Sequence, residues 1–292
     1  MSGARPLALV GAFLALVLIW GSTWGAIRVG LGGIPPYTGV SLRFGLAALV
    51  LFATARALGV KLQYGPRVRM LWIVETVFGF CISYGVVYWA EDQGVPSGLG
   101  SVLFATFPLF VALLAWIWLA GERPTPAGVV GLLLGFGGVL LIFSDDLATG
   151  GDPRVLFASV LFLLSPAAAA VAHVVVKRYG GGIHPINLAA PPMAACGVIM
   201  GAVALAVEGE REVVFDAVSV GALLYLAIFG SAVTFTLYYW LLARATATRV
   251  ALVTYGIPVV ALFLGTVFLH EPLTAKTVTG AALVIGGVAL AS

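Results

Sequence analysis

The feature that most constrains this chain is an internal duplication within a succession of apolar segments. Residues 97–143 read as two hydrophobic helices joined by the turn GERPTP, and nearly the same pattern returns at residues 247–292. At a shift of 149 residues, nine of the 22 positions from Glu122 to Phe143 are identical to the second copy. Shared apolar composition alone does not explain that identity. We therefore interpret the chain as two related halves, residues 1–146 and 147–292.

The apolar segments are long enough to cross a membrane, which takes about 20 residues for a helix. With 61% hydrophobic and 9% charged residues, the composition excludes a soluble fold. The first segment lacks a small-residue cleavage site, so we interpret it as a retained span and not as a signal peptide. We expect an all-α polytopic membrane protein with ten spans, at residues 7–29, 37–58, 70–90, 96–119, 127–143, 154–176, 185–207, 217–242, 248–269 and 275–291.

The placement of basic residues predicts the orientation. Lys and Arg concentrate on the cytoplasmic side of membrane proteins. If the N-terminus is cytoplasmic, the inner loops hold ten of them, namely Arg5, Arg56, Lys61, Arg67, Arg69, Arg123, Lys177, Arg178, Arg244 and Arg249. The outer ends then hold four, namely Arg28, Arg154, Arg211 and Lys276. We therefore expect a multi-pass protein of the plasma (inner) membrane with both termini in the cytoplasm.

An odd number of helices per half means that the second half enters the membrane upside down. At a shift of 149, Trp24 aligns with His173 and Arg28 with Lys177, and at a shift of 151 Tyr88 aligns with Tyr239. Inverted repeats are typical of transporters that work by alternating access, with a substrate site near the midplane between the halves. The sequence thus predicts two inverted five-helix repeats.

With these features the chain resembles the EamA-type family of the drug/metabolite transporter superfamily. The resemblance rests on WGSTW (20–24), on IPPYTGVSLRF (34–44), on the mid-helix prolines and on the paired GE-x-x-T and HE-x-x-T turns (121–125 and 270–274). It covers essentially the whole chain. It implies ten helices in two inverted halves and the export of small metabolites, often amino acids or related compounds.

Two sets of repeated residues have both a gating and a structural interpretation. Glu122 and Glu271 would be symmetric gates on opposite membrane faces, but we favour a structural role in which Thr125 and Thr274 cap the following helices. Pro108 and Pro258 lie near the centres of their segments, where each removes a backbone hydrogen bond. They are either gating elements beside the central cavity or tolerated kinks.

Aromatic residues follow helical spacing at several places. Trp20, Trp24 and Arg28 lie one turn apart, so Trp24 and Arg28 would form a cation–π pair. Tyr84 and Tyr88 form a similar stripe. Trp and Tyr also populate the lipid interface, and by depth Tyr88, Trp89, Tyr238, Tyr239 and Trp240 suit that belt. We expect Trp20, Trp24 and Tyr84 to line the substrate cavity, with Tyr88 as a further candidate.

Arg43 is predicted to lie inside the membrane, about seven residues into the second span. An intramembrane ion is expensive in lipid, so it marks a functional site by default. We predict that Arg43 faces the cavity or a helix break and helps to bind an anionic substrate group or to form the outer gate. The structural alternative is an arginine that reaches the interface or holds a helix end through carbonyl groups.

Glu75 and His173 are the remaining buried polar candidates, and both lie in the inner third of their spans. We expect His173 to contact substrate and Glu75 to act in gating. If the two side chains pair, their proton occupancy would change as the inner side opens, which would make protons the coupling ion. The alternative is that Glu75 satisfies neighbouring backbone or hydroxyl groups while His173 lies elsewhere in the core.

These residues favour a secondary transporter for a small molecule over two other classes. A membrane-embedded enzyme would need a nucleophile–base set or metal ligands, and neither HExxH nor GxSxG is present. A channel or passive facilitator of the same architecture is not separated from a transporter by sequence. No Walker A motif is present, and Cys81 and Cys196 lie in apolar runs, so we expect no cofactor, no metal and no disulfide.

Overall fold

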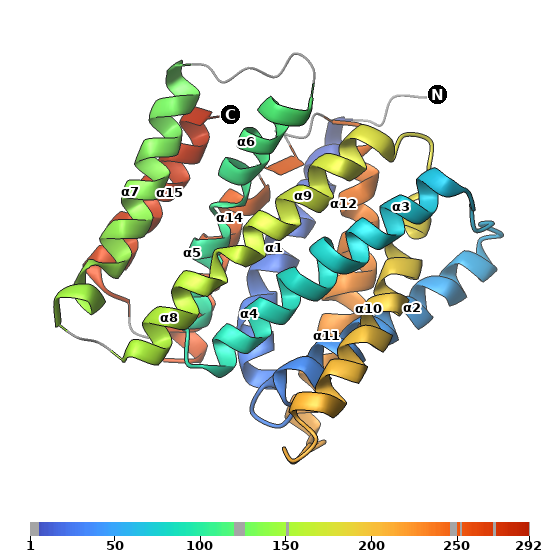
Figure 1. Cartoon of the computed structure of the whole chain (residues 1–292), viewed down its shortest axis with the longest axis horizontal. Coiled ribbons are helices and arrows are strands. Elements are labelled where there is room, and N and C mark those ends of the chain that lie inside the picture. The colour runs from blue at the N-terminus through green and yellow to red at the C-terminus, as the bar shows by residue number, and fades with distance from the viewer. Residues whose placement is uncertain are drawn as a thin grey trace.

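Helices account for all of the regular secondary structure in the part of the chain that the computed structural model describes, which is residues 6–119, 126–149, 152–245, 250–251, 253–270 and 273–291. The elements of the first half are α1 (Pro6–Gly30), α2 (Pro36–Ala57), α3 (Pro66–Val74), the π-helix η1 (Glu75–Ile82), α4 (Ser83–Asp92), α5 (Ser97–Phe104), α6 (Phe107–Trp118) and α7 (Pro126–Thr149). Those of the second half are α8 (Pro153–Phe162), α9 (Leu164–Tyr179), α10 (Pro185–Val207), α11 (Ala217–Ala227), the π-helix η2 (Ile228–Val233), α12 (Thr234–Leu242), α14 (Val253–Phe268) and α15 (Ala275–Ala291). Figure 1 shows them as one bundle of long helices.

The helices have the length and the surface of a polytopic membrane protein. Within the described residues, seven helical segments are long and apolar enough to cross a membrane, and three shorter apolar helices accompany them: Pro126–Gly135, Gly256–Leu269 and Ala275–Gly287. Large apolar side chains such as Leu18, Val198 and Leu205 are exposed on the outside, whereas Arg43 is buried. Apolar side chains outside and polar ones inside are the arrangement that a lipid solvent selects.

Small residues bring α2 and α10 into close contact. A Cβ atom on Gly197 of α10 would lie 3.0 Å from the backbone nitrogen of Gly45, and one on Gly201 would lie 3.0 Å from the hydroxyl of Ser41. That hydroxyl donates a 2.7 Å hydrogen bond to the carbonyl oxygen of Gly197. Close backbone approach at small residues is how membrane helices gain packing energy without a hydrophobic driving force.

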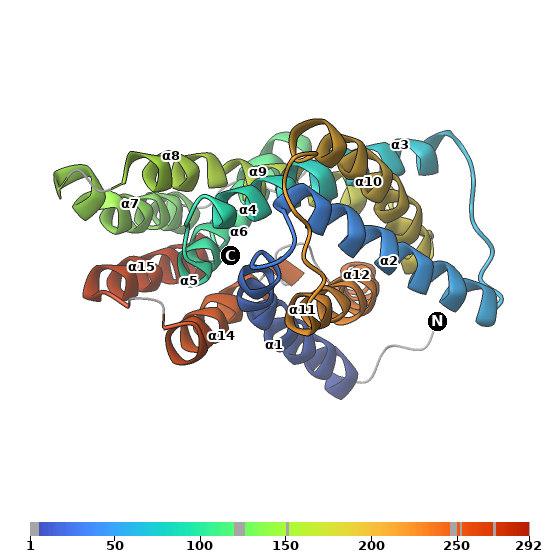
Figure 2. The same ribbon diagram turned by 90° about the horizontal axis from the view of Figure 1, so that it is seen from below.

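The helices α7 and α15 pack side by side at one edge of the bundle (Figures 1 and 2). A Cβ on Gly138 would lie 2.6 Å from the carbonyl oxygen of Gly280, and one on Gly287 would lie 2.5 Å from the carbonyl oxygen of Gly131. In the sequence repeat, Gly131 corresponds to Gly280 and Gly138 to Gly287. The two contacts are therefore reciprocal, as they are across a two-fold axis.

Two long helices change their geometry at matching places. The π-helix η1 interrupts the segment from α3 to α4, and η2 interrupts the segment from α11 to α12. Their central glycines, Gly79 and Gly230, align at the 151-residue shift. A π-helix carries wider hydrogen-bonded turns than an α-helix and often marks a functional site.

The segment that contains Pro108 is broken, which corrects the expectation of a proline at the centre of a helix. The helix α5 ends at Phe104 and α6 begins at Phe107, so Pro108 lies in the first turn of α6. Backbone N–H groups of a first turn have no partner within the helix, so the proline costs no hydrogen bond there. Pro258, in contrast, lies inside α14.

The connection between α10 and α11 binds the first half at one end of the bundle, where Figure 2 shows it beside the connection between α1 and α2. The buried carboxylate of Glu208 accepts hydrogen bonds from the backbone N–H groups of Tyr37 and Thr38, the first turn of α2. An anion at this position stabilises a helix N-terminus. Arg211 adds a two-pronged ion pair to Asp92, with both nitrogen–oxygen distances 2.9 Å.

The same connection ends in a helix cap. Asp216 accepts hydrogen bonds from the backbone N–H groups of Ser219 and Val218, and it caps α11. These bonds, those from Ser219 first, lower the pKa of the Asp216 carboxyl below its ordinary value.

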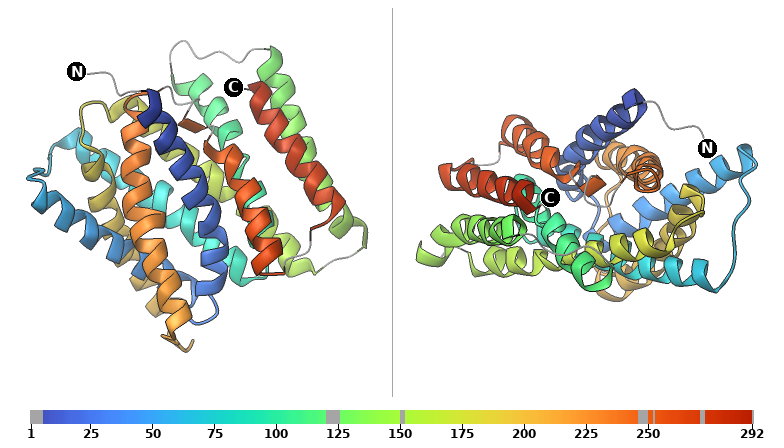
Figure 3. Two further views of the ribbon diagram at one scale, coloured as in Figure 1. Left: turned by 180° about the vertical axis from the view of Figure 1, so that it is seen from behind. Right: turned by 90° about the horizontal axis from the view of Figure 1, so that it is seen from above.

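The first turn of α1 and the last turn of α15 lie at the same end of the bundle, opposite to the connection between α10 and α11 (Figure 3, left). The last turn of α9, which contains Lys177, and the first turn of α3, which contains Arg67, also lie toward that end (Figure 1). Lys177 donates hydrogen bonds to the carbonyl oxygens of Leu242 and Ala245, and Arg67 donates to that of Gly181. Each end of the bundle is thus tied together by polar groups.

Candidate functional site

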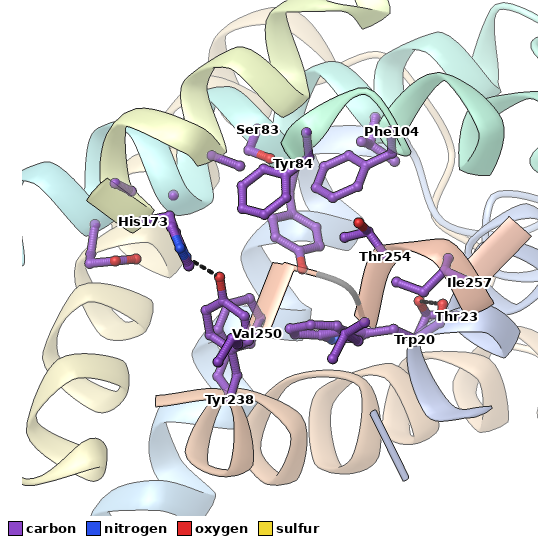
Figure 4. Close-up of a pocket in the computed structure, with 18 of the residues that line it drawn as sticks. Trp20, Thr23, Ser83, Tyr84, Phe104, His173, Tyr238, Val250, Thr254 and Ile257 are labelled. Carbon is purple, nitrogen blue, oxygen red and sulfur yellow. Dashed lines mark hydrogen bonds between the residues drawn. The ribbon is translucent and has the colours of Figure 1, made fainter. Parts of the chain in front are cut away.

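The candidate site is a cavity between the two halves (Figure 4). Small-molecule sites are mostly apolar with a few polar groups, and the lining of this cavity has that composition. The first half supplies residues from α1, η1, α4, α5 and α6, and the second half from α9, α12 and the region of α14. The lining residues are Trp20, Thr23, Trp24, Ile27, Glu75, Gly79, Ser83, Tyr84, Val87, Phe104, Phe107, Ala169, Ala172, His173, Phe235, Tyr238, Tyr239, Val250, Val253, Thr254 and Ile257.

Trp20 and Trp24 lie on the wall of the cavity, one helical turn apart on α1. The ring of Trp20 lies 5.2 Å from that of Tyr238 and 5.5 Å from that of Phe235. Its indole nitrogen is buried and has no hydrogen-bond partner among the described residues, which leaves this donor for a ligand. Trp24 packs against Phe104, with 5.8 Å between ring centroids.

Arg28, the third residue of the expected stripe, turns away from Trp24. Its guanidinium donates a 2.6 Å hydrogen bond to the backbone carbonyl oxygen of Glu91, near the end of α4. The expected cation–π pair of Trp24 and Arg28 is replaced by this link between α1 and α4. A guanidinium satisfies its donors more fully at a carbonyl than over a ring.

His173 lies on the wall and bonds a tyrosine from another helix. Its Nδ1 forms a hydrogen bond with the hydroxyl of Tyr238, drawn as a dashed line in Figure 4, and its ring meets that of Phe107 edge-on. Its Nε2 is buried and has no partner in the part of the chain that the structure describes. The site therefore presents a second polar atom to a ligand. This nitrogen donates or accepts a hydrogen bond according to the tautomer of the imidazole.

Glu75 begins η1 and lies on the same wall. Its side chain shares a hydrogen bond with the side chain of Tyr239, the residue after the partner of His173. Its carboxylate also occupies the space beside Gly79, where a Cβ atom would collide with Oε2. The structure shows no direct pairing of Glu75 with His173: one ring nitrogen of His173 binds Tyr238, and the other has no partner within the described ranges.

Arg43 is 1% exposed and does not line the cavity. Its Nε donates to the hydroxyl of Ser231 at 2.8 Å, and its Nη2 donates to the carbonyl oxygen of Gly230 at 3.0 Å. Both partners belong to η2, so Arg43 faces a helix irregularity and not lipid. The guanidinium donates a hydrogen bond to a backbone carbonyl group that points outward from the widened helical turn.

Tyr84 and Tyr88 have different surroundings. Tyr84 lines the cavity, and the guanidinium carbon of Arg43 lies 4.7 Å from its ring centroid, within cation–π range. Tyr88 is buried behind the wall, where its hydroxyl accepts a 3.4 Å hydrogen bond from Nη1 of Arg43. Sequence reasoning missed Phe235, Tyr238 and Tyr239, although the alignment of Tyr88 with Tyr239 in the repeat pointed to α12.

The gating candidates lie beside the cavity or outside the described residues. Pro108 and Pro258 do not line it, but their neighbours Phe107 and Ile257 do. Glu122, Glu271 and Thr125 lie outside the described residues, so the two interpretations of these turns stay predictions. Thr274 is described, and its hydroxyl oxygen accepts a 3.0 Å hydrogen bond from the backbone N–H of Thr277, as in a helix cap.

Comparison with known proteins places this architecture in a family. The sequence profile of the EamA-like transporter family matches residues 7–144 and again residues 156–292. An uncharacterized inner membrane transporter of Escherichia coli strain K12, YedA, is 32% identical over 267 residues, which are 89% of this chain and 82% of that protein. A probable terminal-alkyne amino-acid exporter of Streptantibioticus cattleyicolor is 30% identical over 284 residues, or 96% and 92% of the two chains.

A solved crystal structure has the same fold. It covers 99% of this chain with a TM-score of 0.72 and 20% sequence identity, and 97% of its own chain is included. The two profile matches together span nearly the whole sequence, and the two relatives cover 89% and 96% of it. On these grounds the chain is a multi-pass membrane protein that belongs to the EamA-like transporter family.

Proposed function

We propose that this protein is a secondary transporter that exports small metabolites, amino acids or related compounds, across the inner membrane by alternating access. The observation that carries the proposal is the cavity, whose wall is shared by the two halves. Trp20 and Glu75 come from the first half, and His173 and Tyr238 come from the second. A site between two bodies opens to either side when one body moves against the other.

The architecture that we propose is ten spans in two inverted five-helix repeats, residues 1–146 and 147–292. Seven long and three shorter apolar helices among the described residues support the number. The reciprocal contacts of Gly131, Gly138, Gly280 and Gly287 support a two-fold relation between the halves. The shared end of the first and last helices supports an even number of spans. We place this end in the cytoplasm because the basic loops gather there.

Protons are the coupling ion that we propose. Glu75 and His173 are on the cavity wall, and each shares a hydrogen bond with a tyrosine hydroxyl of α12. The other titratable groups of the described wall are the phenols of Tyr84, Tyr238 and Tyr239. Movement of α12 would change both hydrogen bonds together, which would link the protonation of the cavity to its opening.

Counterflow in proteoliposomes tests the transport proposal. Vesicles loaded with an unlabelled amino acid, with leucine and phenylalanine as the first probes, should take up the labelled compound transiently and with saturation. Trp20→Ala should lower the rate at least tenfold, because it removes a wall residue. Trp116→Ala is the matched control, since Trp116 is 51% exposed on the outside of α6. Flux that rises linearly with concentration and shows no counterflow would indicate a channel.

A further inference from the structure

Glu75 is the single carboxylate among the described residues that line the cavity. Within the described part of the chain, one ion pair is found, and it joins Arg211 and Asp92. Glu75 therefore has no basic side chain of that part in ion-pair contact. The side chain is 3% exposed, and its hydrogen bond comes from a neutral hydroxyl. A buried carboxylate without a cation is costly, and a cationic ligand would remove that cost.

Arg43, the nearby cation, is not available to a ligand. Its Nε, Nη1 and Nη2 are all engaged, by Ser231, Tyr88 and Gly230 in that order. It does not line the cavity, whereas Tyr84, on whose ring it lies, does. The described wall therefore offers no arginine or lysine to an anionic group of a substrate.

Next to Glu75 the wall is aromatic. Tyr239, the partner of Glu75, lies 5.7 Å from Tyr238, and Tyr238 lies 5.2 Å from Trp20, measured between ring centroids. Phe235 is within 6.0 Å of Tyr239 and 5.5 Å of Trp20. Aromatic faces attract cations and also cover an apolar body, so one set of rings serves both ends of an amphipathic cation.

Among the described residues of the wall, two buried polar atoms have no partner, Nε1 of Trp20 and Nε2 of His173, and we count them as available to a ligand. These suit a neutral acceptor or hydroxyl group on the substrate. A carboxylate placed against them would lose its water shell without gaining a counter-charge, which costs far more than one or two neutral hydrogen bonds return. The described wall therefore discriminates against anions and against the acid group of a zwitterion.

We propose that the cavity selects small protonated amines with an apolar body, and that the ammonium group binds at Glu75 and Tyr239 while the body lies against Trp20, Tyr238 and Phe235. This inference rests on the proposed function and narrows its substrates to the amine relatives of amino acids. The ammonium group supplies the cationic partner that Glu75 lacks, and the aromatic rings enclose the apolar body of the amine.

The test uses three probes that share one phenylethyl body and differ in charge: 2-phenylethylamine, phenylalanine and 3-phenylpropionate. Binding to the purified full-length protein in lipid nanodiscs is measured by isothermal titration calorimetry at pH 7. We expect the amine to bind at least tenfold more tightly than phenylalanine, with no binding of the acid. Equal or tighter binding of phenylalanine, binding of the acid, or no binding of any probe would overturn the inference.

Variants then assign the preference to Glu75. Glu75→Gln should reduce the preference for the amine over phenylalanine to about twofold or less, and Glu75→Asp should keep most of it. The control is Glu210→Gln, an exposed carboxylate in the connection between α10 and α11, which should leave the preference unchanged. If Glu75→Gln does not fold, Tyr239→Phe removes the hydroxyl beside the carboxylate and should weaken amine binding several-fold. An unchanged preference in the folded Glu75 variant would contradict the assignment.

Failure of this inference is distinct from failure of the proposed function. Saturable counterflow of phenylalanine together with weaker binding of the amine would leave a transporter and remove its amine selectivity. Saturable counterflow of 2-phenylethylamine that Glu75→Gln abolishes and Trp116→Ala preserves would support both.

Discussion

At the scale of single residues, the role of Arg43 in the structure differs from the role that its position in the sequence predicts. As an arginine inside a membrane span it is a candidate ligand for a substrate. In the folded protein its donors bind the backbone and side chain of η2, so it positions a helix and does not touch the cavity. A planar guanidinium with five donors is suited to this task in a way that a lysine is not.

Arg43→Lys should therefore lower stability as well as transport. The substitution leaves Gly230 or Ser231 without its partner, and one buried hydrogen-bonding group left unpaired costs about 1–3 kcal/mol. Thermal unfolding in detergent should show a clear decrease of the midpoint. Arg154→Lys, at an exposed position of α8, should not. Loss of transport with an unchanged midpoint would return Arg43 to the role of a substrate ligand.

His173 and Tyr238 should behave as one unit. They share a buried hydrogen bond, whereas Glu75 shares its own with Tyr239. Mutations of two groups in contact show a coupling energy of about 0.5–3 kcal/mol. For groups that share no partner, the effects of the two mutations on stability are additive. Double-mutant cycles on thermal stability should give a larger coupling for His173→Gln with Tyr238→Phe than for His173→Gln with Glu75→Gln. A coupling concentrated between His173 and Glu75 would favour the direct pair expected from sequence.

Part of the candidate site could be predicted from sequence because polar and aromatic residues deep in a span avoid lipid. The structure places Trp20, Trp24, Tyr84, Glu75 and His173 on the wall of the cavity. By depth Tyr238 and Tyr239 also suit the lipid interface, because near a helix end an aromatic residue has two equally good environments. Only the rotation of α12 decides between them, and the apolar sequence around these residues does not fix it.

At the scale of elements, glycines decide how closely helices pack, and neighbouring glycines differ in this respect. Gly138 and Gly287 lie in the contact between α7 and α15. A Cβ atom on Gly137 or Gly286 would meet nothing within 4 Å. The chain therefore contains its own matched controls, one residue away from each contact.

Gly138→Ala and Gly287→Ala should each destabilise the protein, because the new methyl group meets backbone atoms that cannot move aside. Overpacking of this kind costs about 1–3 kcal/mol. Gly137→Ala and Gly286→Ala should be neutral or slightly stabilising, since alanine favours a helix over glycine. Unfolding midpoints in one detergent compare all four. Equal midpoints for Gly137→Ala and Gly138→Ala would disprove the close contact.

Helix positions could be predicted well, but helix geometry could not. The spans follow from long apolar runs, and the structure has a helix in each of them within its described residues. The π-helices η1 and η2 were not expected, because a widened turn depends on what fills the space beside it. For η2 that includes Arg43 from α2, a contact between residues 187 positions apart in sequence.

At the scale of the whole molecule, the positive-inside rule gives a direct test of orientation. Single cysteines replace Glu210 and Gly181, which are exposed at opposite ends of the bundle, in a background without Cys81 and Cys196. A membrane-impermeant maleimide should label position 210 in intact cells and label position 181 only after permeabilisation. A cysteine in place of Asp146, which lies in the last turn of α7 and not in the loop 144–153 expected from sequence, should behave like position 210. The reverse pattern would place both termini outside.

The reciprocal glycine contacts also bear on how the sequence can vary. If two identical five-helix chains met in this way, one alanine at the position of Gly138 would enter both contacts at once. Joined in a single chain, Gly138 and Gly287 are encoded separately, so a substitution disturbs one contact and leaves the other intact. The joined halves are therefore free to differ from each other one position at a time, as they do where Trp24 of the first half aligns with His173 of the second.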